Sequence, residues 1–314
     1  MSTSHASIEQ DNPPAGFKFF KRGESPFNQS MMPMWTRRDE MDYSIGLRLE
    51  KKHCNYQLFM HGGAVASLAD VAMGNAMQSE EKVDVHAATA SMTVDYIGSA
   101  QIGEWVQATA KVLKKGRRLI FIECLITVGL DVGKPKIVAR ASATYIPVRS
   151  PEERTAAGDK VAPQPSPRPG ILAPPPGFRP FITTAAPFDD HLAPLLFKRD
   201  GTDYSMGLRL EKKHCNYQRT IHGGAVATLA DMVMGLVHRR SGEPRVHTVT
   251  ASMTVDYIGS AKVGEWVEGT AKVLKQGRRL YFSECLITVG KDVGEPKIIA
   301  RGNASFMPMR GPEG

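Results

Sequence analysis

The chain has 314 residues, 42% of them hydrophobic and 23% charged, which is typical of a soluble globular protein. No apolar run approaches the roughly 20 residues that cross a bilayer, and residues 1–12 show no features of a secretory signal. We therefore expect no membrane span and a cytoplasmic location. The net charge of +8 favours a phosphate-bearing partner, although a generally basic surface without a ligand is the alternative. No zinc-finger spacing, helix-turn-helix or RNP-like pattern indicates nucleic acid.

The sequence repeats itself. Residues 42–149 align without a gap with residues 203–310, at a constant offset of 161, and about two thirds of the aligned positions are identical. This pattern indicates a tandem duplication. It predicts a disordered N-terminus at 1–12, a first domain at 13–149, a Pro-rich linker at 150–173 and a second domain at 174–310. Within the first domain, residues up to 38 are expected to be irregular and to pack on that domain through Gly16-Phe17 and Pro26-Phe27.

Five strands and one helix are predicted in each repeat. In the first repeat a short strand covers residues 43–49, and a helix rich in small apolar residues begins near Ala64. Alternation predicts a half-buried strand at 91–96, followed by strands at 104–113, 119–128 and 136–148. Gly116 is expected to supply an unusual dihedral angle in the hairpin turn between the third and fourth strands. The helix is too apolar to face solvent, so the sheet should wrap around it.

The stretch His61-Gly62-Gly63, copied as His222-Gly223-Gly224, marks the N-terminus of each helix. Glycines there let a ligand approach backbone N–H groups that lack an intrahelical partner, at the positive end of the helix dipole. Asp70 and Asp231 lie nine residues further on among alanine and leucine. A buried carboxylate is costly unless it is paired or used. The alternative is a helix residue that only bonds to a neighbouring loop.

Cysteine and histidine positions are also duplicated. Cys54/Cys215 and Cys124/Cys285 are expected to be reduced core thiols rather than disulfides. His53, Cys54, His86 and their copies show no tetrad at ligand spacing, so no metal site is predicted.

The element order and the pattern Asn-x5-His-Gly-Gly-x6-Asp, which runs from Asn55 to Asp70 and again from Asn216 to Asp231, resemble the hotdog-fold acyl-CoA thioesterases of the phenylacetate-pathway type. The resemblance covers both repeats. It implies an α+β tandem (double) hotdog fold, in which each unit is a curved antiparallel sheet wrapped around a central helix. It also implies an acyl-CoA substrate, no cofactor beyond the coenzyme A of that substrate, and a homodimer of double-hotdog chains.

The same resemblance assigns roles. The Gly62 N–H and the Asn55 side chain would polarise the thioester carbonyl, and Asp70 would activate water or attack directly. Thr89 would supply an assisting hydroxyl, and His61 would orient the site or interact with the sulfur side of the substrate. The second set is Asn216, His222, Gly223, Asp231 and Thr250. Fixed N–H donors and a carboxylate held in apolar surroundings are the groups that acyl transfer requires.

Arg117 and Arg118, with their copies Arg278 and Arg279, are candidates for binding the coenzyme A phosphates, because guanidinium groups bind phosphate bidentately. A solvated basic hairpin tip is the alternative. Two other functions compete with hydrolysis: an enoyl-CoA hydratase-like double-hotdog enzyme, and a non-catalytic acyl-CoA-binding module. The hydratase would need a His and a carboxylate able to meet in one site, which the spacing does not supply within a unit. A binding module would need no buried carboxylate facing a thioester.

Helix geometry predicts that each site is composite. Nine residues separate His61 from Asp70, which is a net half turn and a rise of roughly 13.5 Å, so the two cannot face one thioester. An antiparallel helix from the other repeat would bring its Asp to the first helix's N-terminus. We therefore expect Asn55, His61 and Gly62 to pair with Asp231 and Thr250, and the second set to pair with Asp70 and Thr89.

Overall fold

The structure, a computed structural model, describes residues 12–21, 25–40, 42–78, 86–149, 173–181, 186–240 and 246–309. Most of the predicted disordered N-terminus (1–12) and most of the predicted linker (150–173) lie outside these ranges.

The first unit contains β1 (Lys18–Phe19), η1 (Phe27–Met31), β2 (Trp35–Asp39), β3 (Asp42–Arg48), η2 (Lys51–His53), α2 (Gly62–Ala76), β4 (Ala87–Tyr96), β5 (Trp105–Lys115), β6 (Ile120–Val128), η3 (Leu130–Val132) and β7 (Lys136–Pro147). The second unit contains β8 (Arg179–Pro180), η4 (Pro187–His191), β9 (Leu196–Asp200), β10 (Asp203–Arg209), η5 (Lys212–His214), α4 (Gly223–Arg240), β11 (His247–Tyr257), β12 (Trp266–Gln276), β13 (Tyr281–Val289), η6 (Lys291–Val293) and β14 (Lys297–Met309).

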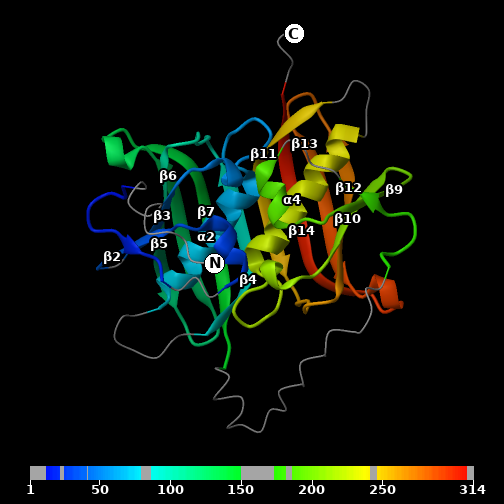
Figure 1. Ribbon diagram of the computed structural model, residues 1–314, viewed down its shortest axis with the longest axis horizontal. Helices are drawn as coiled ribbons and strands as arrows, with labels where there is room; N and C mark the ends of the chain where they lie inside the picture. Colours follow the sequence, from blue (N-terminus) through cyan, green and yellow to red (C-terminus); the bar gives the residue numbers. More distant parts are fainter. Residues whose placement is uncertain are drawn as a thin grey trace.

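The strands form one 14-stranded antiparallel sheet in the order β1-β2-β3-β5-β6-β7-β4-β11-β14-β13-β12-β10-β9-β8. The two units join where β4 pairs with β11. We call this pairing the seam. In Figure 1 the two helices stand side by side in the middle of the molecule, with the strands of one unit on each side. Each half of the sheet wraps one helix, which confirms the predicted α+β double hotdog.

Helix α2 is buried over most of its length because small residues let α4 come close. A Cβ added to Gly63 would lie 2.6 Å from Oγ1 of Thr228, and one added to Gly224 would lie 2.6 Å from Oγ of Ser67. Both hydroxyls donate to the carbonyls of their own helix, at 2.7 Å, so their polar atoms are satisfied inside the contact. The second glycine of each His-Gly-Gly stretch is therefore required by helix packing. No helix in the described ranges has the length and apolar character needed to cross a membrane.

The strands bury alternate residues against the helices. Along β6, Ile120, Ile122 and Cys124 are buried while Phe121 and Leu125 face outward. This alternation is the pattern expected of a sheet with one face on the core. The four cysteines are buried and unpaired, which confirms the prediction of reduced core thiols.

Two expectations about local structure are wrong. The first concerns the N-terminal segment, which adds β1 and β2 to the edge of the sheet instead of being irregular. Phe17 does pack on the first unit, edge-on to Trp105 at 5.3 Å. Phe27, however, docks on the second unit, where its N–H donates to the Cys215 carbonyl at 3.1 Å. The Phe27 ring stacks on the imidazole ring of His222. The edge of the Phe27 ring reaches Gly224, which leaves room for it because glycine has no side chain.

The second concerns the hairpin between β5 and β6. Gly116 has no positive φ, so it does not supply an unusual dihedral angle. A Cβ at this position would lie 2.9 Å from the Leu119 carbonyl oxygen. Glycine is needed there because the two strands approach closely.

Candidate active site

The N-terminus of each helix faces the aspartate of the opposite helix. A Cβ on Gly62 would lie 2.7 Å from Oδ2 of Asp231, and one on Gly223 would lie 2.7 Å from Oδ2 of Asp70. A side chain at either glycine would therefore collide with a carboxylate from the other unit. We call the set Asn55, His61, Gly62, Asp231 and Thr250 the first site, and the set Asn216, His222, Gly223, Asp70 and Thr89 the second site. The structure brings together the residues that the helix rotation predicts.

The histidine at each helix start organises the first turn. Nδ1 of His61 accepts the N–H of Gly63 at 2.9 Å, and Nδ1 of His222 accepts the N–H of Gly224 at 2.9 Å. A neutral ring that accepts at Nδ1 carries its proton on Nε2. Gly62 N–H, in the first turn, has no intrahelical acceptor and stays available to a ligand. Burial lowers the pKa of His222, and nearby Asp70 opposes this shift.

Each aspartate is held by a threonine of its own unit. The Thr250 hydroxyl donates to Oδ1 of Asp231 at 2.7 Å, and the Thr89 hydroxyl donates to Oδ1 of Asp70 at 3.2 Å. Burial raises the pKa of Asp70, and His222, Thr89 and the Gly224 N–H partly oppose this shift. Oδ2 of Asp70 lies 3.7 Å from Nδ1 of His222. A carboxylate whose charged form is disfavoured by burial is suited to take up a proton.

Asn55 is oriented by the backbone that follows it. Its Oδ1 accepts the N–H of Gln57 at 2.9 Å and the N–H of Phe59 at 3.2 Å. With the oxygen engaged in this way, the amide NH2 is the group left to donate. The Asn55 side chain therefore adds a donor beside the helix N-terminus.

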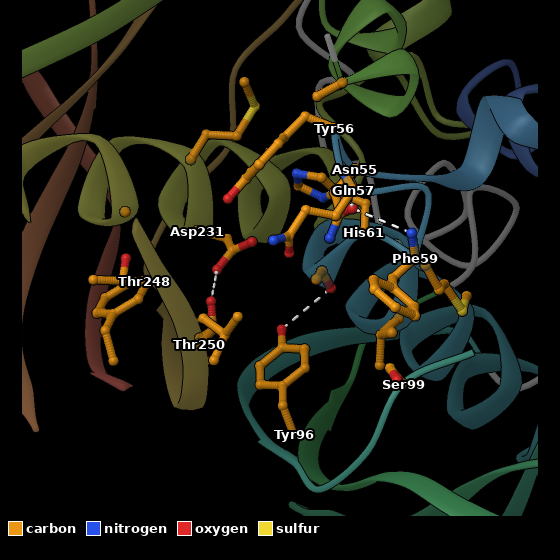
Figure 2. A pocket seen from close by; sticks show the side chains of 18 of the residues that line it. Asn55, Tyr56, Gln57, Phe59, His61, Tyr96, Ser99, Asp231, Thr248 and Thr250 are labelled. Atoms are coloured by element: carbon orange, nitrogen blue, oxygen red, sulfur yellow. Dashed lines mark hydrogen bonds between the residues drawn. The ribbon is translucent and has the colours of Figure 1, made fainter. Parts of the chain in front are cut away.

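The first site opens into a pocket of about 330 Å³. Figure 2 shows Asp231 and Thr250 from the second unit opposite Asn55, His61 and Tyr96 from the first unit. Apolar residues from both units continue the wall: Val65, Val138, Phe181, Met232, Leu236, Phe306 and Met309. Because the pocket combines donors, a carboxylate and an apolar wall, it can bind a polar reactive group joined to an apolar chain.

Sequence reasoning missed two kinds of residue. The Tyr96 hydroxyl donates to the Gly62 carbonyl at 3.2 Å, and the Tyr257 hydroxyl donates to the Gly223 carbonyl at 3.3 Å. Burial raises the pKa of Tyr96 well above its usual value, and Asp231 adds to the shift. The alternation that predicts the strand at 91–96 puts Tyr96 on the same face as Met92 and Val94, and a buried phenol needs a hydrogen-bond partner, so this signal was present in the sequence. Asp189 also lines the pocket and was not predicted.

The remaining candidates lie away from this pocket. The four arginines are exposed at the hairpin tips and do not line it: Arg117, Arg118, Arg278 and Arg279. His53 is buried with a pKa lowered to about 3, first by burial and then by Lys52, and its Nδ1 accepts the N–H of Glu50. Within the described ranges, no three His, Cys, Asp or Glu side chains are grouped so that they could hold a metal ion.

Comparisons with solved structures agree on the fold. The acyl-CoA thioesterase II TesB2 of Mycobacterium marinum matches with a TM-score of 0.59 at 9% identity, covering 93% of this chain and 99% of that one. A protein with a hot dog fold from Alicyclobacillus acidocaldarius matches with a TM-score of 0.60 at 13% identity, covering 94% of this chain and all of the other.

Sequence relatives match one unit at a time. The Pseudomonas aeruginosa protein PA0474, a proposed esterase by its name, is 36% identical over 118 residues, which are 37% of this chain and 87% of the relative. Human acyl-coenzyme A thioesterase 13 is 39% identical over 97 residues, 30% of this chain and 65% of the relative. The sequence profile of the Thioesterase superfamily matches twice, at residues 58–130 and 218–295. The chain therefore belongs to the thioesterase superfamily, with two of its domains in tandem.

Proposed function

We propose that the protein hydrolyses acyl-CoA thioesters in its two composite sites. The observation that carries this proposal is the position of Gly62 at the helix N-terminus, where it lies against the buried Asp231 carboxylate of the other unit in a pocket with an apolar wall. The name of human acyl-coenzyme A thioesterase 13, a relative at 39% identity, supports the choice of substrate class. The pocket offers the polar groups that acyl transfer requires, at one end of a space suited to an acyl chain.

In the first site, the thioester oxygen accepts hydrogen bonds from the Gly62 N–H and from the Asn55 amide. These donors stabilise the negative charge that develops on the oxygen during attack. Asp231 takes a proton from a water molecule as the water oxygen bonds to the carbonyl carbon. The carbon–sulfur bond then breaks, coenzyme A leaves as the thiolate, and the protonated Asp231 returns the proton to sulfur. The products are the carboxylic acid and free coenzyme A.

Asp231 could instead attack the carbonyl carbon itself and form an anhydride, which water would then open. A single turnover in water labelled with 18O detects the covalent route when water opens the anhydride at the Asp231 carboxyl carbon. Direct attack of water places the label only in the released acid. Attack by Asp231, followed by hydrolysis at its own carboxyl carbon, leaves the label in the protein.

The experiment that tests the function is release of free thiol, measured with a thiol reagent, over a panel of acyl-CoA substrates with short, medium, long and aromatic acyl groups. We expect release with at least one class. Absence of release with every substrate would contradict hydrolysis. Hydration of an enoyl-CoA without thiol release would favour the hydratase alternative.

The basic hairpins are proposed to hold the phosphates of coenzyme A. Replacing Arg117, Arg118, Arg278 and Arg279 by alanine should raise KM for acyl-CoA several-fold. The matching pantetheine thioester, which lacks the nucleotide phosphates, should be little affected. An equal effect on both substrates would remove this role.

The assembly is also a proposal. Thioesterases of the phenylacetate-pathway type, which the chain resembles, assemble as four hotdog units, and this supports a homodimer of these chains. The cytoplasmic location stays a prediction. Light scattering should then give twice the chain mass of 34.3 kDa. A mass of one chain at micromolar concentration would contradict the dimer.

A further inference from the structure

Two short segments dock on opposite units in the same way. The N–H of Phe188 donates to the Cys54 carbonyl at 3.1 Å, and the N–H of Phe27 donates to the Cys215 carbonyl at 3.1 Å. The Phe188 ring stacks on His61 with centroids 5.3 Å apart, and the Phe27 ring stacks on His222 at 4.9 Å. The interplanar angles are 26° and 25°. Each site histidine is therefore covered by an aromatic ring from the other unit.

The residue that follows each phenylalanine differs between the two units. It is Asp189 beside the first site and Asn28 at the same register of the repeat. Oδ1 of Asp189 lies 3.2 Å from Nε2 of His61, and the Asp189 side chain is only 9% exposed. This oxygen accepts no well-aligned hydrogen bond from the described residues, and Asp189 lines the pocket. A nearly buried carboxylate thus has the Nε2 edge of His61 as its neighbour.

A carboxylate and an amide constrain an imidazole ring differently. An ionised carboxylate only accepts hydrogen bonds, so Asp189 favours the form of His61 with its proton on Nε2. In that form Nδ1 is free to accept the N–H of Gly63, as observed at 2.9 Å. An amide can accept through its oxygen or donate through its NH2 group, so Asn28, whose Oδ1 accepts no hydrogen bond from the described residues, imposes no such preference on His222.

The other form would change the second site. With its proton on Nδ1, His222 would release the Gly224 N–H and turn a donor toward Oδ2 of Asp70, which lies 3.7 Å away. The helix start would lose a hydrogen bond, and the carboxylate would gain one. Such a change alters both the polarising N–H groups and the proposed base.

We propose that Asp189 is a positioning residue that holds His61 in its Nε2-protonated form, and that Asn28 leaves this constraint out of the second site. The two sites are then chemically unequal although the residues that touch the thioester are the same. The kinetic part of this proposal rests on the proposed hydrolysis, while its spectroscopic part does not.

The first test is the tautomer itself, read from two-bond 1H–15N correlation spectra of the imidazole rings in the full-length protein. His61 should show a single form with Nε2 protonated. Asp189→Asn should move its ring nitrogens toward averaged shifts, whereas Asp190→Asn, which removes an exposed charge one residue further on, should leave them unchanged. Unchanged His61 nitrogens in the Asp189→Asn protein would overturn the proposal.

The reverse change keeps the test decisive if Asp189→Asn does not fold. Asn28→Asp should give His222 the single Nε2-protonated form. If His222 keeps its parental spectrum in that protein, the proposal fails.

The kinetic test uses Asp70→Asn, which inactivates the second site so that turnover reports the first. In this background Asp189→Asn should lower kcat roughly tenfold and leave KM within about twofold. The reason is that the change alters the orientation of the groups that polarise the carbonyl and does not alter substrate binding. Asp190→Asn should change neither constant. A kcat within twofold of the background in the Asp189→Asn protein would overturn the positioning role. Absence of thiol release in the parent protein would instead contradict the hydrolysis.

Discussion

The two sites of this chain share their reactive groups and differ in what surrounds them. In both, a helix N-terminus faces a carboxylate that is bonded to a threonine. Beside the donor asparagine the sites diverge: Asn216 donates from Nδ2 to Oγ1 of Thr220 at 3.0 Å, while Phe59 holds that position in the first unit. One of the two N–H donors of the Asn216 amide is therefore already engaged, whereas Phe59 offers no hydroxyl to the Asn55 amide.

The wall next to the carboxylate differs as well. Thr250 pairs across the sheet with Phe306, and Thr89 pairs with Tyr145. Burial raises the pKa of Tyr145 well above its usual value, with a further contribution from Asp70, so the phenol stays neutral beside the carboxylate. The duplication has kept the polarising residues constant and changed their neighbours, so we expect the two proposed sites to prefer different acyl groups or to work at different rates.

The largest effect should come from removing both carboxylates. The double variant Asp70→Asn with Asp231→Asn should lose at least about a hundredfold in rate, because a base or nucleophile contributes several kcal/mol to lowering the barrier. Its circular dichroism spectrum should match that of the parent. Hydrolysis at a near-parental rate would exclude both aspartates from catalysis.

Paired variants then test whether each site really spans the two units. Asn55→Ala with Asp231→Asn places both changes in the first site, so the turnover of the second site should survive. Asn55→Ala with Asp70→Asn places one change in each site and should depress both. Rates of acyl-CoA hydrolysis decide the matter. If the second pair keeps one site's turnover while the first pair abolishes activity, each unit carries its own site.

Exchanging the wall residues should have an intermediate effect. Tyr145→Phe removes a hydroxyl near Asp70 and makes the second site resemble the first, so its ranking of acyl-CoA substrates should approach that of the first site, with changes of a few-fold in kcat/KM. The measurement uses the Asp231→Asn background, in which the second site alone turns over. Phe306→Tyr in the Asp70→Asn background is the matched reverse change. Unchanged rankings in both would show that this wall does not select the acyl group.

The smallest expected effect is on stability. Burial raises the pKa of Asp70 in the folded protein, so its stabilising contribution is present at low pH and is lost as the pH rises through the raised value. At pH 7, well above the pKa of an unfolded aspartate, the raised pKa of Asp70 means that this residue lowers stability, and Asp70→Asn should increase the melting temperature slightly. The increase should vanish toward pH 4, near the pKa of an unfolded aspartate. The exposed Asp190→Asn change should show no such gain, and an equal gain from it would contradict the burial argument.

Much of this architecture follows from local pattern. Small residues from Ala64 onward predict a buried helix, which α2 confirms, and alternation predicts the inward face of β4. The pairing of Gly62 with Asp231 follows from the 100° rotation per residue, because one helix cannot present both ends of the motif to one ligand. These features depend only on neighbours in sequence and on the existence of the repeat.

Contacts between distant segments were harder to foresee. The Phe27 N–H donates a hydrogen bond to the Cys215 carbonyl, and nothing in the composition near Phe27 indicates a partner so far along the chain. Asp189 lies beside His61 only because its segment docks on the first unit. The difference between Asp189 and Asn28 could therefore not be interpreted from the sequence alone. Gly116 was misread because close approach of strands and an unusual dihedral angle both select glycine.

The seam between β4 and β11 also determines how a substrate can reach either site. Backbone pairing there is reinforced by the Thr93–Thr254 hydroxyl contact at 2.9 Å and by the Ser91 hydroxyl, which donates to Asp256 at 2.9 Å. Each site draws residues from both sides of the seam, yet the two sides cannot swing apart without breaking a row of hydrogen bonds in mid-sheet. The two units therefore cannot open about a hinge at the seam. Tyr56 and Gln57 line the pocket of the first site, so we expect the entry of a thioester and the escape of its products to depend on how quickly such side chains move.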